Sequence, residues 1–405
     1  MLIATKLVVA ALTVGVGASA ARPRPPRPAA PTLAFTVQNR LNQARPAETV
    51  SLPNDRWQAL AAKVGVEKLV VKDARSGAVL VSQLLDNDGD GHPDELLFQT
   101  ALPAHGQRKF TLSVGSAAPS TGGLTTFARF VPERTDDYAW ENDRVGFRTY
   151  GPVAEQLFDK KDRNGTLSSG MDCWLKRVSY PIIDKWYGAA VAESGYYHKD
   201  RGEGYDPYHV GTSRGCEGTG VWADGQLAVS RNFTSYKTLA TGPVRAVFEL
   251  TYAPWAAAGQ QVTEKKHISL DLGSNMSRYE EYLSAPAPLP NCTIGITLHQ
   301  QKGQVRADSA AGWFRYWEPV DDSFVGTGVV LDPTAVLRFL DYRTAQKDQS
   351  QLLIMARPTP APLPLVYYAG FGWTKSGQFA GAPAWDAYLA AFAQRLASPL
   401  VVKWQ

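Results

Sequence analysis

The 405-residue sequence has few cysteines and, beyond its first segment, no excess of basic residues. Its three cysteines, Cys173, Cys216 and Cys292, form no Cys-x-x-Cys pair, which excludes zinc ribbons and thioredoxin-like motifs. We expect either a Cys173–Cys216 disulfide or three buried free thiols. Four of the 42 basic residues precede residue 31, and the other 38 equal the 38 acidic residues in number. This balance leaves no basic stripe for nucleic acid, which we do not expect as a partner.

The signatures of two nucleotide-dependent enzyme classes are also missing. The glycine-rich tract at residues 210–220 lacks the Lys-Ser/Thr ending and the following helix of a phosphate-binding loop. No dinucleotide fingerprint follows a predicted strand, so hydride transfer is unsupported. We therefore expect no organic cofactor. Internal repeats with a period of 20–50 residues are absent as well.

The first 20 residues contain an apolar run that is short for a membrane span. Lys6 precedes the run from Leu7 to about Val16, and a small-residue cleavage pattern ends at Ala20. This predicts a signal peptide over residues 1–20, with an anchoring helix as the alternative. Residues 21–31 (ARPRPPRPAAP) predict an extended Pro/Arg linker. The mature protein is therefore expected to be exported, periplasmic or secreted, with no membrane attachment once the leader is cleaved.

Most of the remaining sequence alternates apolar with polar residues, which predicts strands. "EKLVVKDARSGAVLVSQLL" predicts two strands around Ser76-Gly77, whereas "WDAYLAAFAQRLASP" and "NDRWQALAAKVG" predict a long and a short helix. Small and turn-forming residues at 115–128 indicate a domain boundary. We predict a mainly β protein with a small N-terminal β domain at residues 32–118, followed by a large antiparallel β domain at residues 129–405 that is built of sandwiched sheets.

An acidic loop separates two of the predicted strands. Asp86, Asp88, Asp90 and Asp94 stand at positions 1, 3, 5 and 9 of this loop. That spacing suits a hard cation held by oxygen ligands. Leu97 stands where a calcium-binding helix–loop–helix needs glutamate, so the loop is not an EF-hand. We expect a structural calcium site, and the alternative is a hairpin turn with solvated carboxylates.

Several long motifs occur in order along the chain. They are "DGDGHPDELLFQ", "DDYAWENDRVGFRTYGP", "SGMDCWLKRVSYPIIDKWY", "YYHKDRGEGYDPYHVGTSRGCEGTGVW", "NFTSYKTLATGPVRAVFELTY" and "ISLDLGSNMSRYE". With these motifs the sequence resembles the bacterial domain-of-unknown-function family DUF4861 over most of the mature chain. The resemblance implies a galactose-mutarotase-like β-supersandwich for the large domain. It also implies a setting among polysaccharide-degrading enzymes, particularly those for pectin, ulvan and other uronic-acid polymers.

Residues 198–222 are the densest polar stretch of the chain. Elimination across C4–C5 of a uronic acid needs a cation on the carboxylate, a base for the C5 proton and an acid for the leaving oxygen. The candidate catalytic residues in this stretch are His198, Tyr205, Tyr208, His209 and Arg214. We predict that the stretch lines the active cleft. A transition-metal site here is disfavoured, because no helix would bring the histidines and carboxylates onto one face.

Other side chains of these motifs are suited to saccharide binding. The candidate substrate-binding residues are Trp140, Asn142, Arg144, Trp174, Lys176, Lys185, Trp186 and Glu203. Indole rings stack on sugar rings, and the amide and charged groups can bind hydroxyls or a uronate. Core packing, turn capping and ion pairing are the corresponding structural alternatives.

Together these features favour an exported carbohydrate-active enzyme. It would act by β-elimination, as a lyase or dehydratase, on oligosaccharides that contain uronic acid. One alternative is a mutarotase- or epimerase-like enzyme, and another is a non-catalytic glycan-binding protein. The expected partner in every case is an oligosaccharide or polysaccharide.

Overall fold

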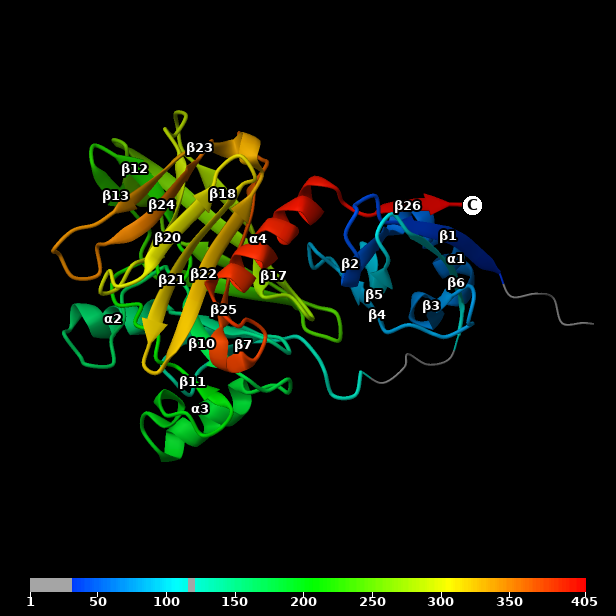
Figure 1. Ribbon diagram of the computed structural model, residues 1–405, viewed down its shortest axis with the longest axis horizontal. Helices are drawn as coiled ribbons and strands as arrows, with labels where there is room; N and C mark the ends of the chain where they lie inside the picture. Colours follow the sequence, from blue (N-terminus) through cyan, green and yellow to red (C-terminus); the bar gives the residue numbers. More distant parts are fainter. Residues whose placement is uncertain (1–30, 116–120) are drawn as a thin grey trace, which may run out of the picture.

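The computed structural model describes residues 31–115 and 121–405. The predicted signal peptide, nearly all of the predicted linker and part of the predicted domain boundary lie outside these ranges. The described chain is mainly β, as predicted, and every pairing between its named strands is antiparallel. Figure 1 shows a small body formed by the N-terminal segment beside a larger one. No helix in the described ranges is both long and apolar enough to cross a membrane.

The small body contains two facing sheets, one with the strand order β26-β1-β6-β3 and one with the order β2-β5-β4. The strands are β1 (Thr32–Gln38), β2 (Arg45–Pro53), β3 (Leu69–Asp73), β4 (Ser82–Leu85), β5 (Glu95–Leu102), β6 (Gln107–Val114) and β26 (Val401–Trp404). The short helices are η1 (Asn54–Arg56), α1 (Gln58–Val64) and η2 (Val66–Lys68). Alternate residues face inward, so Phe35, Phe98 and Phe110 meet in a buried core.

The C-terminal strand belongs to the small body. The sequence assigned residues up to 405 to the large domain, but β26 pairs with β1 and places Trp404 opposite Phe35. The two rings lie 4.9 Å apart. The strand therefore covers the edge of the small core with an aromatic residue, and the two ends of the described chain meet in one sheet.

The two strands predicted around Ser76-Gly77 do not form a hairpin with each other. β3 pairs with β6, whereas β4 pairs with β5 in the other sheet. A single bridge between Lys72 and Val79 links the segments. The alternation of residues identified both strands, but it carries no information about which strands pair.

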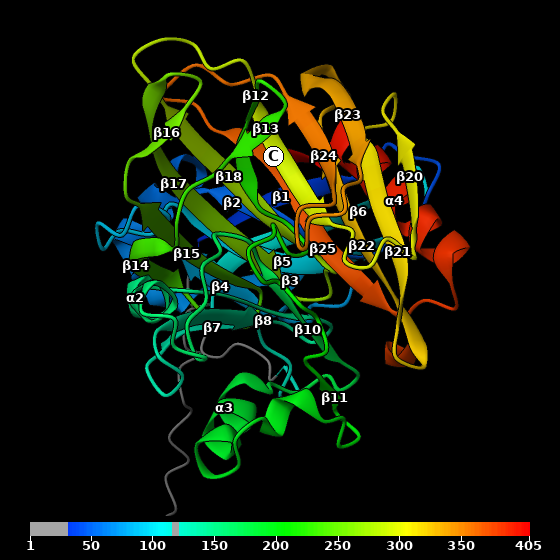
Figure 2. The same cartoon turned by 90° about the vertical axis from the view of Figure 1, so that its left-hand side faces the viewer.

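The large body contains three sheets (Figure 2). The first is β11-β10-β9-β8-β7, formed by β7 (Phe127–Val131), β8 (Asp137–Glu141), β9 (Gly146–Thr149), β10 (Asp172–Lys176) and β11 (Gly204–Tyr205). The second is β13-β12-β19-β24-β23, formed by β12 (Thr219–Ala223), β13 (Gln226–Ala228), β19 (Cys292–Thr297), β23 (Val336–Tyr342) and β24 (Gln351–Ala356).

The third sheet has nine strands in the order β14-β15-β17-β18-β25-β22-β21-β20, with β16 paired to β17. Its strands are β14 (Phe233–Ala240), β15 (Arg245–Tyr252), β16 (Trp255–Ala257), β17 (Gln260–Asp271), β18 (Met276–Ser284), β20 (Gln304–Asp308), β21 (Trp313–Val320), β22 (Ser323–Leu331) and β25 (Leu365–Trp373). All three sheets contribute to one core, which includes Phe147, Ile294 and Phe371. One face of the long sheet is therefore buried.

Helices cover the outer faces of the large body. They are α2 (Pro152–Asp159), η3 (Tyr196–His198), α3 (Ile183–Ala192), η4 (Pro333–Ala335), η5 (Thr374–Ser376) and α4 (Ala382–Ala397). The predicted C-terminal helix is confirmed as α4, whose Trp385 and Leu389 pack against β21 and β22. The sequence did not predict α3, which packs on the sheet of β8 and β10 through Ile183 and Trp186.

Candidate functional site

Residues 198–222 occupy three separate places rather than one cleft. His198 ends η3 and lies against Asp206. The segment after β11 reaches a surface pocket through Tyr208 and His209. Arg214 lies in the interior of the large body with 2 % exposure. His198, whose side chain is 53 % exposed, and His209 therefore lie at separate places on the surface, and Arg214 is accessible from neither.

The pocket has a volume of about 490 Å³ and is formed by four segments distant in sequence. Three of them are the loop after β11, the loop between β19 and β20, and the end of β21 with the turn after it, and the loop between β23 and β24 adds a fourth. Its lining consists of Pro207, Tyr208, His209, His299, Gln300, Lys302, Glu318, Pro319, Val320, Asp321, Lys347 and Asp348. We call it the His209 pocket.

His209 is the exposed histidine of this pocket. Its Nε2 lies 3.2 Å from Asp348 Oδ1 and 3.3 Å from Oδ2, and the imidazole side chain is 55 % exposed. Its Nδ1 has no hydrogen-bond partner in the described part of the chain. Asp348 thus holds the ring by one nitrogen and leaves the other directed to solvent, an arrangement suited to a general base.

His299 lies behind His209 with both ring nitrogens bonded. Nδ1 is 2.6 Å from Glu318 Oε1, and Nε2 is 2.7 Å from the carbonyl oxygen of His209. Burial lowers the pKa of His299, but the hydrogen bond and charge of Glu318 outweigh burial and raise it overall. Because both partners are acceptors, the ring is an imidazolium that fixes the backbone of His209. Both of its N–H protons are held in these two hydrogen bonds, so neither is available for transfer to a substrate.

Strained backbone is concentrated around this pocket. Three residues of its lining, His299, Asp321 and Asp348, have positive φ values of 43°, 49° and 61°. Gln301, next to the lining residue Gln300, has a φ of 61°. Non-glycine residues in this conformation are uncommon, and they cluster where a structure holds functional groups in place. The backbone conformation therefore marks the pocket independently of its side chains.

The pocket also presents two unpaired cations. Lys302 and Lys347 are exposed and form no ion pair or side-chain hydrogen bond with a described residue. By contrast, Tyr205 is engaged, because its hydroxyl donates to Asp321 Oδ2 at 2.6 Å. The rings of Tyr208 and His299 pack edge to face with their centroids 4.6 Å apart, and the buried Tyr208 hydroxyl has no hydrogen-bond partner among the described residues. Lysines, rather than tyrosines, are thus the polar groups available beside His209.

The predicted sugar-stacking tryptophans are core residues. Trp140 and Trp174 are fully buried, and Trp186 is 2 % exposed. Trp140 stacks on Phe147, and Trp174 lies between Trp186 and Tyr197. Their faces are covered by protein, so they present no surface to a saccharide.

Two of the predicted polar binding residues stabilise turns and strands. Asn142 donates to the carbonyl oxygens of Asp271 and Ser274 at 2.7 Å. Lys176 is buried and pairs with Glu141 at 2.6 Å. The polar atoms of Asn142 and Lys176 are therefore occupied by protein partners.

Lys185 and Glu203 form an ion pair on the outer side of the first sheet. Lys185 Nζ lies 2.6 Å from Glu203 Oε1, and Glu203 also accepts from Tyr180 and Trp186. This pair holds α3 to the segment before β11 and lies outside the His209 pocket. Arg144, the last of the predicted binding residues, lines a different cavity between the two bodies.

Arg214 belongs to a buried ionic network. Its Nη1 donates to Ser169 Oγ at 2.7 Å. Burial lowers the pKa of Arg214, and the nearby carboxylates of Glu264 and Glu217 oppose this shift. The sequence assigned Arg214 to the substrate carboxylate, but the guanidinium is buried, donates to Ser169 Oγ and lies near the protein carboxylates of Glu264 and Glu217.

His198 lies over a second buried network. Its Nδ1 is 2.8 Å from the carbonyl oxygen of Asp206. Beneath it, Arg148 donates to Asp172 and Asp206 at 2.7 Å each. Burial raises the pKa of both carboxyl groups above their usual range, although Arg148 opposes the rise. This network ties β9, β10 and the segment after β11 together.

Residues 211–215 have the spacing Gly-x-Ser-x-Gly, but they do not form a nucleophile elbow. The Ser213 hydroxyl is fully buried and donates to the carbonyl oxygen of Val210. No helix follows, and β12 begins at Thr219. The serine therefore lacks both the exposure and the strand–turn–helix context that acyl transfer requires.

The three cysteines are free and buried, which is one of the two expected outcomes. The thiols of Cys173 and Cys216 lie near each other in the core of the large body. Burial raises the pKa of all three thiols, so they are poor nucleophiles.

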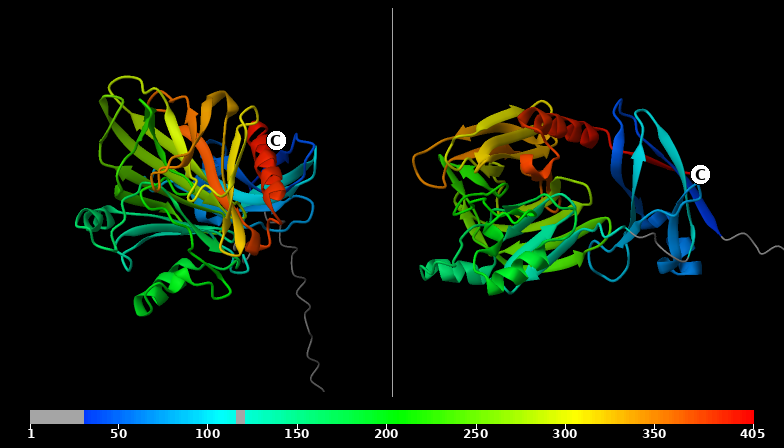
Figure 3. Two further views of the ribbon diagram at one scale, coloured as in Figure 1. Left: turned by 60° about the vertical axis from the view of Figure 1, so that its left-hand side comes forward. Right: turned by 60° about the horizontal axis from the view of Figure 1, so that its bottom comes forward.

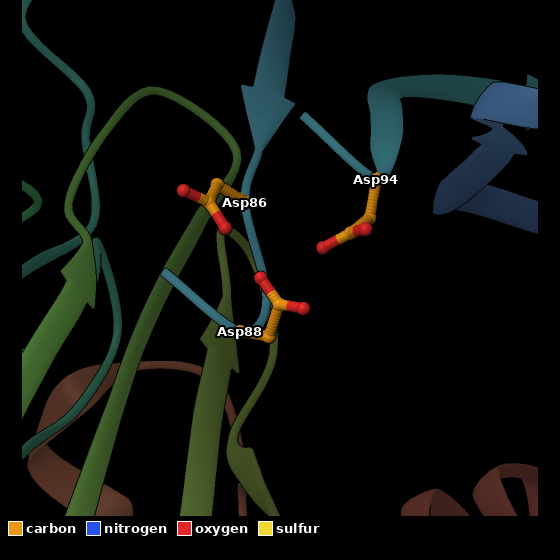
Figure 4. Close-up of side chains that lie close together, drawn as sticks. All are labelled: Asp86, Asp88 and Asp94. Atoms are coloured by element: carbon orange, nitrogen blue, oxygen red, sulfur yellow. The ribbon is translucent and has the colours of Figure 1, made fainter. Parts of the chain in front are cut away.

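The acidic loop brings together three of its four predicted ligands (Figure 4). One carboxylate oxygen each from Asp86, Asp88 and Asp94 lies within 4.8 Å of the others. Asp90 is not in this group, and its Oδ1 instead accepts from the backbone N–H of His92 at 2.7 Å. The four-ligand prediction is thus reduced to a possible acidic cation site of three carboxylates.

Sequence reasoning missed most of the His209 pocket. It did not identify His299, Glu318, Asp348 or the two lysines as site residues. His209 is 90 residues from His299 and 139 from Asp348 along the chain. The sequence offers no local signal beyond a histidine and a lysine in "LHQQKG" after a strand.

Sequence comparison assigns the chain to a family. The domain described as "Domain of unknown function (DUF4861)" matches residues 37–402. The chain belongs to the DUF4861 family. "Uncharacterized protein P7" of Formosa agariphila is 42 % identical over 373 residues, which cover 92 % of this chain and 93 % of that protein. The resemblance read from the motifs is confirmed over nearly the whole described chain.

Structure comparison finds more distant similarity. The chain is similar to an alpha-mannosidase from Enterococcus faecalis V583, with a TM-score of 0.48, 10 % identity and coverage of 92 % of this chain and 46 % of that one. It is also similar to a protein in the glycosyl hydrolase family 38 from Enterococcus faecalis, with a TM-score of 0.46, 10 % identity and coverage of 92 % and 47 %. This DUF4861 protein therefore spans about half the length of these two solved structures.

Proposed function

We propose that this DUF4861 protein is an exported carbohydrate-active enzyme that eliminates across C4–C5 of uronic-acid residues in oligosaccharides. The large body would be a galactose-mutarotase-like β-supersandwich that carries the reaction in the His209 pocket. The observation that supports the proposal most is the free Nδ1 of a carboxylate-oriented histidine beside two unpaired lysines in one pocket.

Each group of the pocket has a role in this reaction. Lys302 and Lys347 would bind the uronate carboxylate, and their charge makes the C5 proton more acidic. His209 Nδ1 would remove that proton while Asp348 holds the ring. Electrons of the C5–H bond then form the C4=C5 double bond as the C4–O bond breaks.

The same imidazole can complete the step. Having taken the C5 proton, His209 is an acid next to the departing O4 and can return the proton to it. The oxygen then departs as a hydroxyl group of the neighbouring saccharide in a lyase, or as water in a dehydratase. A single base–acid group suffices, so the buried hydroxyl of Tyr208 and the bonded hydroxyl of Tyr205 are not needed.

Product absorbance tests this proposal directly. Oligosaccharides from pectin, alginate, glucuronan and ulvan are incubated with the protein, and the ultraviolet band of the 4,5-unsaturated uronate is followed. We expect the absorbance to rise with at least one substrate and the product mass to match either chain cleavage or loss of water.

Absence of the band with all four substrates contradicts elimination. Proton exchange at a sugar carbon, seen by NMR without an unsaturated product, would support the epimerase-like alternative. Binding with unchanged ligand mass after long incubation would support the glycan-binding alternative.

We further propose that the acidic cluster binds calcium as a structural ion. Its donors are all carboxylate oxygens, which suit a hard cation. Asp86 also accepts from the backbone N–H groups of Gly89 and Gly91 at 2.6 and 2.8 Å, so the loop is already shaped around this side chain. The ion would tie the end of β4 to the start of β5.

Thermal melting with and without chelator tests the calcium site. A cation bound only to the folded state stabilises it, so chelation should lower the melting temperature and added calcium should restore it. Asp88→Asn should abolish this response. Asp90→Asn is the matched control and should keep it, because Asp90 lies outside the cluster. A melting temperature that excess chelator leaves unchanged contradicts the proposal.

A further inference from the structure

A cavity of about 370 Å³ lies between the small and large bodies. The small body contributes residues 46–49 of β2 and Gln99 of β5, and the large body contributes the β17–β18 hairpin and the last turns of α4. The right-hand view of Figure 3 shows the two bodies side by side, with α4 and β26 passing from one to the other. We call this space the interdomain cavity.

Four arginines but only two carboxylates line the interdomain cavity. Two of these arginines are closely paired. Arg245 donates to both carboxylate oxygens of Asp271, at 2.5 and 2.9 Å. Arg278 pairs with Glu280 on the same strand. The surplus positive charge therefore resides on the other two arginines, Arg144 and Arg395.

Arg144 has only long contacts. Its Nη1 lies 3.4 Å from Asn275 Oδ1, and its Nε lies 3.9 Å from Asp143. Ordinary N–H···O hydrogen bonds are about 2.7–3.2 Å long. Its side chain is 38 % exposed, so its donors are free to bind a ligand in the cavity.

Arg395 is similarly unsatisfied. Its guanidinium makes no hydrogen bond to a residue of the described ranges, and its nearest carboxylate oxygen, on Glu48, is 3.8 Å away. Glu48 is shared with Arg45, whose Nη1 is 3.6 Å from the same carboxylate oxygen. One carboxylate thus faces two guanidinium groups, and the donors of Arg395 remain available.

Arg395 packs against two aromatic rings of α4 that also line the cavity. The guanidinium carbon of Arg395 lies 5.9 Å from the ring centroid of Tyr388 and 5.1 Å from that of Phe392. Burial raises the pKa of Tyr388, and the positive charges of Arg395 and Arg144 both oppose this rise. Arg144, Arg395 and Tyr388 all line the same cavity, so both cations border the space beside this ring.

We infer that the interdomain cavity is a second binding site, which holds the carboxylate or sulfate group of an acidic saccharide between Arg144 and Arg395. Paired guanidinium donors suit such oxyanions. The rings of Tyr388 and Phe392, which also line the cavity, can cover the apolar face of a sugar. Neither arginine belongs to the His209 pocket, so this inference does not depend on the elimination reaction.

Binding measurements on full-length variants test the inference. The background throughout is His209→Ala with Lys302→Ala and Lys347→Ala, so that turnover cannot consume the ligand and the His209 pocket has no lysine left to bind the acidic probes. Calorimetry compares oligogalacturonate, a sulfated oligosaccharide, a neutral oligosaccharide and inorganic sulfate. We expect Arg144→Gln and Arg395→Gln each to weaken binding of an acidic oligosaccharide by about tenfold or more, in line with the loss of a hydrogen bond to a charged group. The double variant should bind the acidic oligosaccharide no more tightly than it binds the neutral one.

Arg231→Gln is the matched control, because it removes the same charge from an exposed arginine outside both cavities. It should leave the affinity unchanged, and all variants should keep the wild-type circular dichroism spectrum. A stronger response to the sulfated than to the carboxylated probe, or the reverse, identifies the oxyanion. The inference is overturned if the double variant binds the acidic probes as tightly as the protein with both arginines does. It is also overturned if the protein with both arginines binds acidic and neutral probes equally well.

Discussion

His209→Ala should lower turnover on the responsive acidic oligosaccharide by at least about a hundredfold. Removal of a positioned general base costs about 10²–10⁴ in rate. The side chain is half exposed, and its one bonded nitrogen contacts only Asp348. The fold should therefore survive, and the measurement is the rate of increase of the unsaturated-uronate absorbance.

Asp348→Asn probes the orientation of the ring. Asp348 contacts His209 Nε2 rather than the free nitrogen, so it is a positioning residue in the proposed reaction. We expect kcat to fall by about tenfold or more while KM changes little, because losing an orienting group weakens base catalysis without removing a carboxylate-binding cation. A purely structural role would instead lower the amount of folded enzyme and leave kcat per folded molecule unchanged.

Variants of two other histidines test whether the loss of turnover is specific to His209. His105→Asn changes an exposed histidine of the small body, and asparagine tolerates its positive φ of 50°. Turnover should be unaffected. If His198→Ala abolishes turnover and His209→Ala does not, the reaction takes place beside Asp206 and the His209 pocket is not the active site.

The sequence predicted the fold class because strand alternation is a local signal. Residues such as Phe35 and Val37 of β1, or Ile268 and Leu270 of β17, face one side at a spacing of two, and burial of that side follows. Helix α4 was predicted for the same reason, from its apolar positions and the stop at Ser398-Pro399. Pairing partners were not predictable, since β26 joins a strand more than 360 residues away.

The candidate site was predicted less well, because exposure depends on what covers a residue. Trp140 and Lys176 sit in sequence motifs rich in charged residues, which suggests exposed side chains, yet opposing sheets bury both. Two glycines of the 198–222 stretch are required by close backbone packing. A Cβ at Gly204 would lie 1.9 Å from the Leu175 carbonyl oxygen, and one at Gly215 would lie 2.0 Å from that of Met171. These glycines permit close packing of backbone segments rather than bending side chains into a cleft.

The largest loss of stability is expected from Lys266→Met. Lys266 is fully buried in the network that includes Arg214, and its Nζ lies 2.6 Å from Glu281 Oε2 and 3.2 Å from Glu264 Oε1. Glu217 is also nearby and fully buried. Breaking a buried ion pair from one side leaves uncompensated charge and costs about 3–5 kcal/mol. The measurement is the free energy of unfolding from urea titration followed by circular dichroism.

The network already has unsatisfied acceptors, which makes the lysine more important. Glu217 Oε2, Glu264 Oε2 and Glu281 Oε1 are buried without a hydrogen-bond partner in the described residues. Lys266 is the cation that contacts Glu264 and Glu281 directly. Methionine fills a similar volume but supplies no donor, so the loss should come from charge rather than from a cavity.

The pH dependence of this loss distinguishes charge from packing. Burial raises the pKa of Glu281 in the folded protein, although Lys266 opposes the rise. The stability linked to this raised pKa is fully present below the pKa of an unfolded glutamate, about 4.3, and is lost as the pH rises through the higher folded value. Without the ammonium group the carboxyl groups can take up protons in acid. The deficit of Lys266→Met should therefore be smaller at pH 5 than at pH 9.

Lys265→Met is the matched control on the adjacent position of β17. Lys265 points to the other face, is 43 % exposed and pairs with Glu249 at 2.8 Å. Exposed ion pairs contribute about 0–1 kcal/mol, so this variant should unfold close to the wild type at every pH. If Lys266→Met matches Lys265→Met in stability, or if its deficit is the same at pH 5 and pH 9, then the buried carboxyl groups are not held ionised by Lys266. The network would then be neutral in the folded protein.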